Sequence, residues 1–264
     1  MPAGETIETS LSGGVLEIAL NRPDRLNAIN TAMRAELAAA FTMAAEDEAV
    51  RCILLSARGR GFCAGQDLGE RPPPPPGERH DLGKALGEEY NPLFRQIAAL
   101  PKPVVSAVNG VAAGAGLSLA IAADVTFAAS DARFILSFAN IGLGPDCGTS
   151  WHLPRLIGSQ RAKALAMSGE AFTGEDAARW GMVWKAVPPA ELQSAAAGFA
   201  ARLAAQPPLA LATVKRAMDA SWHASLSDQL EAERIMQREL GHTDDYVEGV
   251  AAFREKRKAV FTGR

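Results

Sequence analysis

The sequence contains little cysteine, and what it has shows no metal-binding pattern. Cys52, Cys63 and Cys147 are far apart and lack the paired spacing of zinc ligands. The histidines also show no metal-binding spacing, so we expect no metal ion. An odd number of scattered cysteines does not form a disulfide framework, which favours reduced thiols and a cytoplasmic location.

A strong charge of either sign and a long apolar run are missing as well. The 27 basic and 30 acidic residues leave a net charge of −3, without the basic excess typical of nucleic-acid-binding proteins. Residues 111–129 come closest to a membrane span of roughly 18–20 apolar residues, but Ser118 and Asp124 interrupt them. The polar first residues show no signal-peptide pattern. We therefore expect neither nucleic acid nor membrane among the partners.

Hydrophobic patterning in the 264-residue chain predicts alternating strands and helices. Residues 6–20 alternate and turn at Gly13-Gly14, which predicts a hairpin. Thr31 is expected to cap a helix that runs to Asp47 and buries Met33, Leu37, Phe41 and Ala44. Further strands are expected at 52–57, 104–108, 125–129, 134–138 and 182–187, and helices at 84–99, 113–123, 149–157, 160–168, 174–180, 189–204, 207–220, 224–240 and 245–257. The order strand, strand, helix, repeated about three times before a helical tail, favours an α/β fold.

A run of prolines interrupts this pattern. Residues 69–83 contain Pro72 to Pro76 followed by Gly77, which excludes a helix or a central strand. We expect a surface loop with a polyproline stretch at its start. It is either an insertion or a lid over the glycine-bearing segment that precedes it.

Two glycine-bearing loops and one carboxylate are the main candidates for chemistry. FCAGQDL at 62–68 and NGVAAGAG at 109–116 each follow a strand-like run and can turn a main-chain N–H towards a cavity. Two such N–H groups on one carbonyl oxygen would stabilise an enolate. Asp146, in LGPDCG, is a candidate base, although it could instead cap a helix beginning near Thr149. Close packing of a helix on a strand is the alternative explanation of the second loop.

Several motifs in order resemble the enoyl-CoA hydratase/isomerase, or crotonase, family over nearly the whole chain. They are NRPDRLNA (21–28), GFCAGQDL (61–68), PKPVVSAVNGVAAGAG (101–116), AADV (122–125), GLGPDCGTSWHLPRLIG (142–158), WGMVWKAV (180–187) and EGVAAFREKRK (248–258). The resemblance implies a spiral of ββα units over residues 1–200 and a helical trimerisation region over 201–264. It also implies acyl-CoA thioester substrates, a homotrimer or a dimer of trimers, and no cofactor apart from the CoA of the substrate.

The resemblance assigns the two oxyanion donors to the backbone N–H groups of Gln66 and Ala115. The two glutamates with which family hydratases activate water fall on Ser118 and Phe138, neither of which is a carboxylic acid, so we expect poor hydration. Asp146 falls where isomerases of the family carry an aspartate. We expect burial to raise its pKa and suit it to carry a proton from the α-carbon along the acyl chain.

The resemblance also implies contacts with substrate elsewhere. It places CoA contacts at Arg25, Leu26, Ala28, Ala64, Gln66, Asp67 and Leu68, acyl contacts at Asn91 and Phe138, and closure of the CoA site, often from a neighbouring subunit, at Phe253 and Lys256. Simpler explanations stay open for three of these: a solvated Arg25, a surface position for Asn91 beside a core Tyr90, and a charged helix face around Lys256. Phe138, Ile141 and Leu143 suggest an apolar acyl pocket.

Within the family the chain resembles the isomerases that convert a ring-epoxidised phenylacetyl thioester to its oxepin. A Δ3→Δ2 enoyl-CoA isomerase would need the same base and stays open. Enoyl-CoA hydratase is a further alternative. Dehalogenation is disfavoured because the histidine and tryptophan it implies fall on Asn91 and Phe138. A non-catalytic acyl-CoA-binding protein is the alternative from another class.

Overall fold

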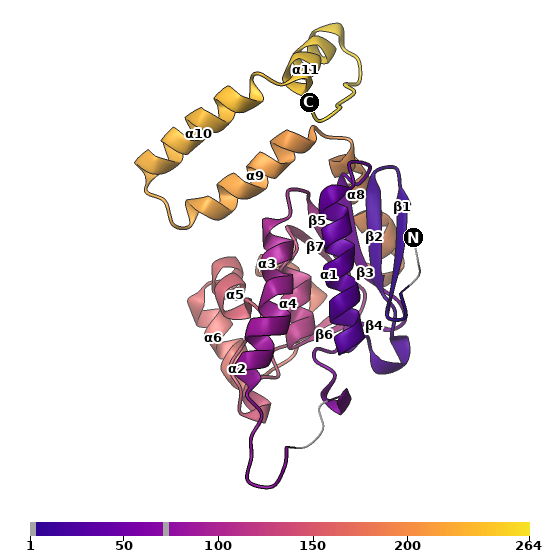
Figure 1. Ribbon diagram of the computed structural model, residues 1–264, viewed down its shortest axis with the longest axis vertical. Coiled ribbons are helices and arrows are strands. Elements are labelled where there is room, and N and C mark those ends of the chain that lie inside the picture. The colour runs from indigo at the N-terminus through magenta and orange to yellow at the C-terminus, as the bar shows by residue number, and fades with distance from the viewer. Residues whose placement is uncertain (1–3, 71–73) are drawn as a thin grey trace.

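Two β-sheets of different size carry the fold in the computed structural model, which describes residues 4–70 and 74–264 (Figure 1). The larger sheet has the order β1-β2-β3-β5-β7-β10, with β1 and β2 antiparallel and the later neighbours parallel. Its strands are β1 (Ile7–Ser12), β2 (Val15–Leu20), β3 (Cys52–Ala57), β5 (Val104–Val108), β7 (Val125–Ala129) and β10 (Lys185–Val187). The hairpin expected over residues 6–20 is confirmed.

The smaller sheet has the order β4-β6-β8-β9. It consists of β4 (Gly61–Cys63), β6 (Val111–Ala113), β8 (Arg133–Ile135) and β9 (Phe172–Thr173). Three successive strand pairs, β3 and β4, β5 and β6, β7 and β8, each give their first strand to the large sheet and their second to the small one. The expected α/β fold with a repeated ββα unit is thereby confirmed.

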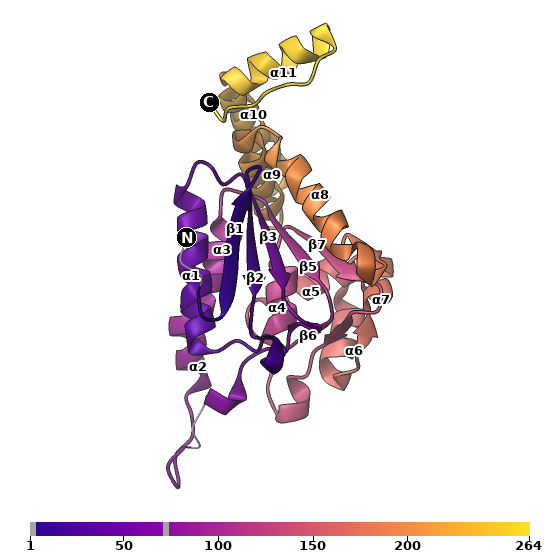
Figure 2. The same ribbon diagram turned by 90° about the vertical axis from the view of Figure 1, so that its right-hand side faces the viewer.

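Helices cover both faces of the large sheet, as Figure 2 shows. Helices α1 (Thr31–Glu46) and α3 (Asn91–Ala99) lie side by side on one face, and α8 (Leu192–Ala204) packs on the other. The remaining helices are α2 (Leu82–Ala85), α4 (Ala115–Ile121), α5 (Thr149–Ile157), α6 (Ser159–Ser168), α7 (Gly174–Arg179), α9 (Pro208–Ser221), α10 (Leu226–Leu240) and α11 (Asp244–Glu255). Across the described ranges, no helix combines the length and apolar character needed to cross a bilayer.

Helix α1 shows how local sequence sets an element and its buried face. Its N-cap is Asn30, not Thr31 as expected, because the extended Asn30 places its side-chain oxygen 2.8 Å from the N–H of Met33. The expected inner face of Met33, Leu37, Phe41 and Ala44 is confirmed as buried. On another face, the Glu36 carboxylate accepts N–H groups of Glu5, Thr6 and Ile7 and ties the N-terminal strand to the helix.

The helix expected at 84–99 is in fact interrupted. It begins at Leu82, where the Asp81 side chain accepts the N–H of Lys84, and passes through a π-helical turn at Leu86–Tyr90 into α3. Pro92 has no N–H with which to bond a carbonyl of the preceding turn, and this accounts for the change from α-helical to π-helical hydrogen bonding here. The π turn brings Tyr90 into the core.

Several other expected boundaries were wrong. The strand expected at 134–138 ends at Ile135, because the chain turns into a 3-10 helix at Ala139–Ile141. The strand expected at 182–187 begins only at Lys185, since the N–H of Met182 bonds the carbonyl of Ala177 at the end of α7. The helix expected at 113–123 begins at Ala115, because β6 occupies the preceding residues.

Two further expectations keep their status as predictions. The division into a core of residues 1–200 and a tail of 201–264 falls inside α8, which ends at Ala204. The lid expected from Pro72–Pro76 falls partly on residues 71–73, which lie outside the described residues. The three cysteines are free and buried, as expected.

A glycine at the start of α4 allows this helix to lie directly against the end of β4. A β-carbon at Gly116 would lie 2.1 Å from the carbonyl oxygen of Cys63. We expect Gly116→Ala to lower the free energy of unfolding by about 1–3 kcal/mol, because backbone must move to admit the methyl group. Urea unfolding followed by circular dichroism measures this.

The matched control is Gly198→Ala in the exposed part of α8, where no backbone atom lies within 4 Å of the added carbon. This change should stabilise the protein by about 0.5–1 kcal/mol. Equal stability of the two variants would contradict the close approach of α4 and β4.

Candidate active site

Three neighbouring parallel strands of the small sheet deliver the candidate site. β4, β6 and β8 run in the same direction, so their carboxyl ends meet at one edge. Gln66 follows β4 by three residues, and Ala115 follows β6 by two. Asp146 lies further along the chain that leaves β8. Gln66, Ala115 and Asp146, the candidates from the two glycine-bearing loops and the LGPDCG motif, therefore all lie on segments that leave the same edge of the small sheet.

The two glycine-bearing loops touch each other through backbone. A β-carbon at Gly65 would lie 2.7 Å from the carbonyl oxygen of Ala113 and 3.5 Å from the amide nitrogen of Ala115. Gly65 has a φ of +94°, in the left-handed region that glycine tolerates. The amide of Gln66, which follows Gly65 directly, is thereby held beside that of Ala115.

Both of these N–H groups lack a protein acceptor. The neighbouring Asp67 donates its N–H to the carbonyl of Ile29, and successive amides of an extended segment point to opposite sides, so that of Gln66 faces away from Ile29. Ala115 is the first residue of α4, where an N–H has no acceptor within the helix. No hydrogen bond from either group occurs in the described parts of the chain. Two such N–H groups on touching loops suit a shared oxygen.

Asp146 lies in the turn before α5 and does not cap it. The N-cap of α5 is Gly148, and no side chain caps the helix, which removes the simpler explanation of Asp146. Its backbone carbonyl instead accepts the N–H of Thr149 at 2.9 Å. The carboxyl is half-buried, and its Oδ1 atom is buried without a hydrogen-bond partner. A buried, unpartnered carboxyl oxygen is free to accept a proton from a substrate.

Electrostatics around Asp146 favour the protonated form. Burial raises the pKa of Asp146 above its ordinary value, and a hydrogen bond with the Cys147 side chain opposes part of this shift. Burial also raises the pKa of Cys147, and the nearby Asp146 charge raises it further, so this thiol is not a ready nucleophile. A raised pKa brings a carboxyl nearer the range useful for proton transfer at neutral pH.

Two aromatic side chains bound the site. The Phe138 ring is buried and would lie 3.8 Å from a β-carbon at Gly114, the residue before Ala115. Tyr90 is buried, and its hydroxyl accepts a hydrogen bond from Arg34. Burial raises the pKa of Tyr90 to about 12, with contributions from the Asp146 and Cys147 charges, so the phenol stays protonated. Ile141 and Leu143, expected to line an apolar pocket, are instead exposed, since the chain turns outward at Gly142.

The segment 21–28 lies against the first glycine loop. Asn27 is fully buried with φ +55°, and its amide donates to the carbonyls of Arg58 and Gly61. The N–H of Ala64 bonds the carbonyl of Leu26, so these two expected CoA-contact positions adjoin each other. Ala28 is buried, and Leu68 is exposed.

Two arginines lie beside this loop. Arg22 forms an ion pair with Asp67, whereas Arg25 forms none within the described residues. Arg22 bonds the Asp67 carboxylate at 2.9 Å and the carbonyl of Ala28. Asp67 therefore braces the loop and is already engaged. Arg25, three residues further along at the end of a single 3-10 turn, is exposed. The sequence offers two arginines in NRPDRLN and no signal that separates their roles.

A cavity of about 970 Å³ opens beside the Asp146 turn. Asn91 from α3, Cys147, and His152 from α5 line it, together with residues of α9. Burial lowers the pKa of His152, which keeps its ring neutral at neutral pH. Asp146 and Ala115 do not line this cavity, so it adjoins the candidate site from the side of α3 and α5. In the described part of the chain, no three histidine, cysteine or acidic side chains gather as metal ligands.

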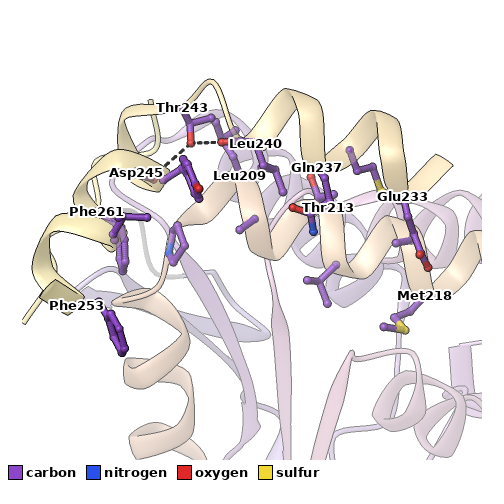
Figure 3. Close-up of a pocket in the computed structure, with 18 residues that line it drawn as sticks. Leu209, Thr213, Met218, Glu233, Gln237, Leu240, Thr243, Asp245, Phe253 and Phe261 are labelled. Atoms are coloured by element: carbon purple, nitrogen blue, oxygen red, sulfur yellow. Dashed lines mark hydrogen bonds between the residues drawn. The ribbon is translucent and has the colours of Figure 1, made fainter. Parts of the chain in front are cut away.

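Phe253 and Lys256 are not brought to the site by a single chain. Phe253 is 85% exposed and lines a second cavity, of about 710 Å³, within α9, α10 and α11 (Figure 3). Lys256 is exposed at the end of α11. Both views of the molecule show α11 at the end opposite β6 (Figures 1 and 2).

Comparison with known proteins decides the family. The model of the enoyl-CoA hydratase/isomerase family matches residues 10–264. The chain belongs to this family. It is 46% identical over 260 residues to the 1,2-epoxyphenylacetyl-CoA isomerase of Escherichia coli, covering 98% of this chain and 99% of that protein. It is also 46% identical over 259 residues to a protein of Rhodobacter capsulatus described as "Probable enoyl-CoA hydratase", with 98% of each covered.

Solved structures of the family agree with the fold. An enoyl-CoA hydratase from Bacillus anthracis superposes with a TM-score of 0.92 at 31% identity, covering 98% of this chain and 100% of that one. Both hydratases and isomerases are therefore among the relatives of this crotonase. Overall similarity leaves the reaction to be argued from the site.

The site of this family member also contains a pair that sequence reasoning missed. Ser118 and Thr149 are fully buried, and their side-chain oxygens lie 2.5 Å apart. The sequence indicates Ser118 as an interruption of an apolar run and as the position of a missing glutamate, and Thr149 as a helix start, but it does not indicate that they meet. A small hydroxyl residue gives no periodic or motif signal, so only the contact reveals the pair.

The raised pKa of Asp146 has a consequence for stability. A carboxyl whose pKa is raised on folding contributes stability below its unfolded pKa and loses that contribution as the pH rises through its folded pKa. Asp146→Asn should therefore melt at or above the wild-type temperature at neutral pH, and the difference should shrink in acid. Differential scanning calorimetry at several pH values measures it.

Asp131→Asn, a change at an exposed aspartate, is the control and should melt like the wild type at each pH. A large loss of stability in Asp146→Asn at neutral pH would show that the carboxylate is needed for folding. That result would contradict the inference that burial makes the ionised Asp146 carboxyl unfavourable in the folded protein.

Proposed function

We propose that this crotonase isomerises acyl-CoA thioesters by moving a proton through Asp146. The backbone N–H groups of Gln66 and Ala115 hold the thioester oxygen while it carries negative charge. The observation that supports this most is the buried, unpartnered Oδ1 of Asp146, in a turn whose backbone carbonyl lies 3.4 Å from the Ser118 hydroxyl of α4, the helix that begins at Ala115. One ionisable group and two donors are what an allylic proton shift requires.

The steps balance without a further reactant. The Asp146 carboxylate takes the α-proton, the C–H bond breaks, and its electron pair moves onto the thioester oxygen. The enolate then collapses, a new double bond forms next to the thioester, and the same carboxyl returns the proton to the γ-carbon. Each amide donor contributes about 2.7–4 kcal/mol of barrier lowering, and a positioned base about 10²- to 10⁴-fold in rate.

Hydration is disfavoured because neither position at which family hydratases carry a glutamate holds a carboxylic acid here. Ser118, at one of the positions where family hydratases carry glutamate, has its hydroxyl engaged by Thr149. Phe138, at the other, presents a buried ring. A water molecule placed between them would have no carboxylate to activate it.

The acyl group we propose is the ring epoxide of phenylacetyl-CoA, converted to the oxepin: the C–C bond shared by the epoxide and the six-membered ring breaks as its two double bonds become three, and Asp146 then moves the α-proton to the γ-carbon. The support is the 46% identity to an isomerase of that name, together with the apolar Phe138 wall. The second candidate is a Δ3-enoyl-CoA, since the same lone carboxyl performs that shift. The CoA part would lie along Arg25, Leu26, Ala28, Ala64, Asp67 and Leu68, with the exposed Arg25 free to meet a phosphate.

We also propose that the protein is a homotrimer or a dimer of trimers held by its tail. Helices α9 and α10 contain no buried residue, and large apolar side chains stand exposed on them. They include Met218 on α9 and Leu226 and Leu230 on α10, and Trp222 is exposed in the connection between the two helices. Such a face needs cover. A neighbouring copy would supply it and would bring Phe253 and Lys256 towards the CoA site of the next subunit.

Asp146→Asn tests the chemistry. The amide cannot take the α-proton, so isomerisation of a 3-enoyl-CoA and of 1,2-epoxyphenylacetyl-CoA should fall by about 10²- to 10⁴-fold. Absorbance of the conjugated product and NMR of α-proton exchange in deuterium oxide measure the two effects. Wild-type hydration of crotonyl-CoA should be slow beside isomerisation.

Three outcomes would overturn the proposal. Full turnover by Asp146→Asn would remove the base. Rapid hydration of crotonyl-CoA would restore the hydratase alternative. Tight binding of acyl-CoA by the wild type without any α-proton exchange would indicate a non-catalytic binding protein.

Leu226→Glu with Leu230→Glu tests the assembly. Charges on the exposed face of α10 should block association, so light scattering should report a change from a trimer or hexamer to a monomer. Met167→Glu on α6, where an apolar side chain is 75% exposed outside the tail, is the control and should keep the wild-type mass. A monomeric wild type would contradict the proposed assembly.

A further inference from the structure

A buried pair of hydroxyl groups joins the two halves of the candidate site. Ser118 on α4 and Thr149 at the start of α5 are both 0% exposed. Their side-chain oxygens lie 2.5 Å apart. Burying a hydroxyl without a partner is costly, and each of these supplies the partner of the other.

The same pair reaches the backbone on both sides. Ser118 Oγ lies 3.2 Å from the carbonyl oxygen of Gly114 and 3.4 Å from that of Asp146. A serine hydroxyl carries one proton, so it donates to one carbonyl at a time while it accepts from Thr149. The N–H of Thr149 donates to the same Asp146 carbonyl at 2.9 Å. Gly114 directly precedes the Ala115 amide.

In the described chain, the Asp146 carboxyl bonds only its own turn, through the Cys147 side chain and its own backbone N–H, and its Oδ1 atom bonds nothing. That atom has no hydrogen-bond partner, so its direction follows from the backbone that carries it. The two residues after Asp146, Cys147 and Gly148, both have positive φ, at 51° and 81°. A turn of this kind is determined by what its ends are bonded to, and here one end is bonded to Ser118 and Thr149.

We propose that Ser118 and Thr149 are positioning residues that set the distance between the Ala115 amide and the Asp146 carboxyl. They do not touch the substrate. This inference rests on the proposed isomerase function, because the distance matters only if those two groups act on one thioester. A misplacement of about 1 Å in such a site costs on the order of 100-fold in rate.

Ser106, a second buried serine, allows a positioning role of Ser118 to be distinguished from a role in packing the core. Ser106 on β5 is also 0% exposed, and its Oγ has no hydrogen-bond partner. The fold therefore accommodates a fully buried serine that bonds nothing. The bonds of Ser118 and Thr149 are thus not a general requirement for burying serine here, and Ser106→Ala is a matched control.

Hydroxyl-free variants of the full-length protein test the proposal. Thr149→Val keeps the side-chain shape without the hydroxyl, and Ser118→Ala removes the other partner. With a 3-enoyl-CoA, each should lower kcat by about 10- to 100-fold and leave KM within about threefold, because the proposed CoA contacts lie elsewhere. Thr149→Ser keeps a hydroxyl and should recover most of kcat. The double variant should lose little more than either single one.

The pH profile gives a readout that a purely structural role would not move. The titratable groups that face Asp146 are Cys147 and, from the helix packed against it, Tyr90. A loosened turn admits water to Asp146, which lowers its pKa towards the ordinary value. The acid limb of kcat should therefore move to lower pH in Thr149→Val, and should stay in place in Ser106→Ala and Thr149→Ser.

The outcomes separate this proposal from the function on which it rests. Full turnover by Asp146→Asn would overturn the isomerase function itself. An inactive Asp146→Asn with unchanged kcat and pH profile in folded Thr149→Val would overturn only the positioning role. Circular dichroism checks folding. If both hydroxyl-free variants fail to fold while Thr149→Ser folds, the pair serves folding and the positioning role is wrong.

Discussion

The site depends on two close contacts between backbone segments, and in each contact one of the two residues is a glycine, which has no β-carbon. Gly65 lies against Ala113, and Gly116 lies against Cys63, at distances that leave no room for a methyl group. These contacts hold the loops after β4 and β6 together. Gln66 follows Gly65 directly and Ala115 lies two residues after Ala113, and in the described parts of the chain neither of their amides has a protein acceptor. A packing requirement and a chemical one are therefore met by the same glycines.

The second element of the site is the Asp146 carboxyl, one oxygen of which makes no hydrogen bond in the folded protein. The Oδ1 atom of Asp146 is buried without a partner, which burdens the folded state when the group is ionised. Proteins tolerate such groups where the surrounding structure determines their position. Here the surroundings are the turn at Cys147 and Gly148 and the hydroxyl pair beneath it. The arrangement is suited to a base whose pKa lies above the ordinary range.

The tail connects assembly with chemistry. Its helices α9 and α10 bury no residue of their own, and α11 projects beyond the sheet. Under the proposed assembly, a second copy would cover these faces and place Phe253 near a CoA group. Stability of the tail and completion of the CoA site would then depend on the same contact.

Much of the fold could be predicted because it depends on local, repeated apolar character. Strands β3, β5 and β7 are continuous apolar runs, and their bounds match expectation. The buried face of α1 follows from helical spacing. The three-residue strands β4 and β6 were not foreseen, since they are too short for a pattern and form only by pairing within the small sheet, β4 with β6 and β6 with β8. Phe138 was expected in a strand and lies beyond one, because a turn of the chain overrides its β propensity.

For the candidate site as well, some features could be predicted from the sequence and others only from the tertiary structure. Residue type alone indicated the glycine loops and Asp146 as a carboxylate in a small-residue turn, and the resemblance to the family indicated the lack of a second acid at Ser118 and Phe138. Which groups meet was decided by tertiary structure. Arg22 and Asp67 are 45 residues apart, and Ser118 and Thr149 are 31 apart. Spacing in sequence carries no record of such contacts, because they form only when the fold brings separate elements together: the segments after β2 and β4 for the first pair, and helices α4 and α5 for the second.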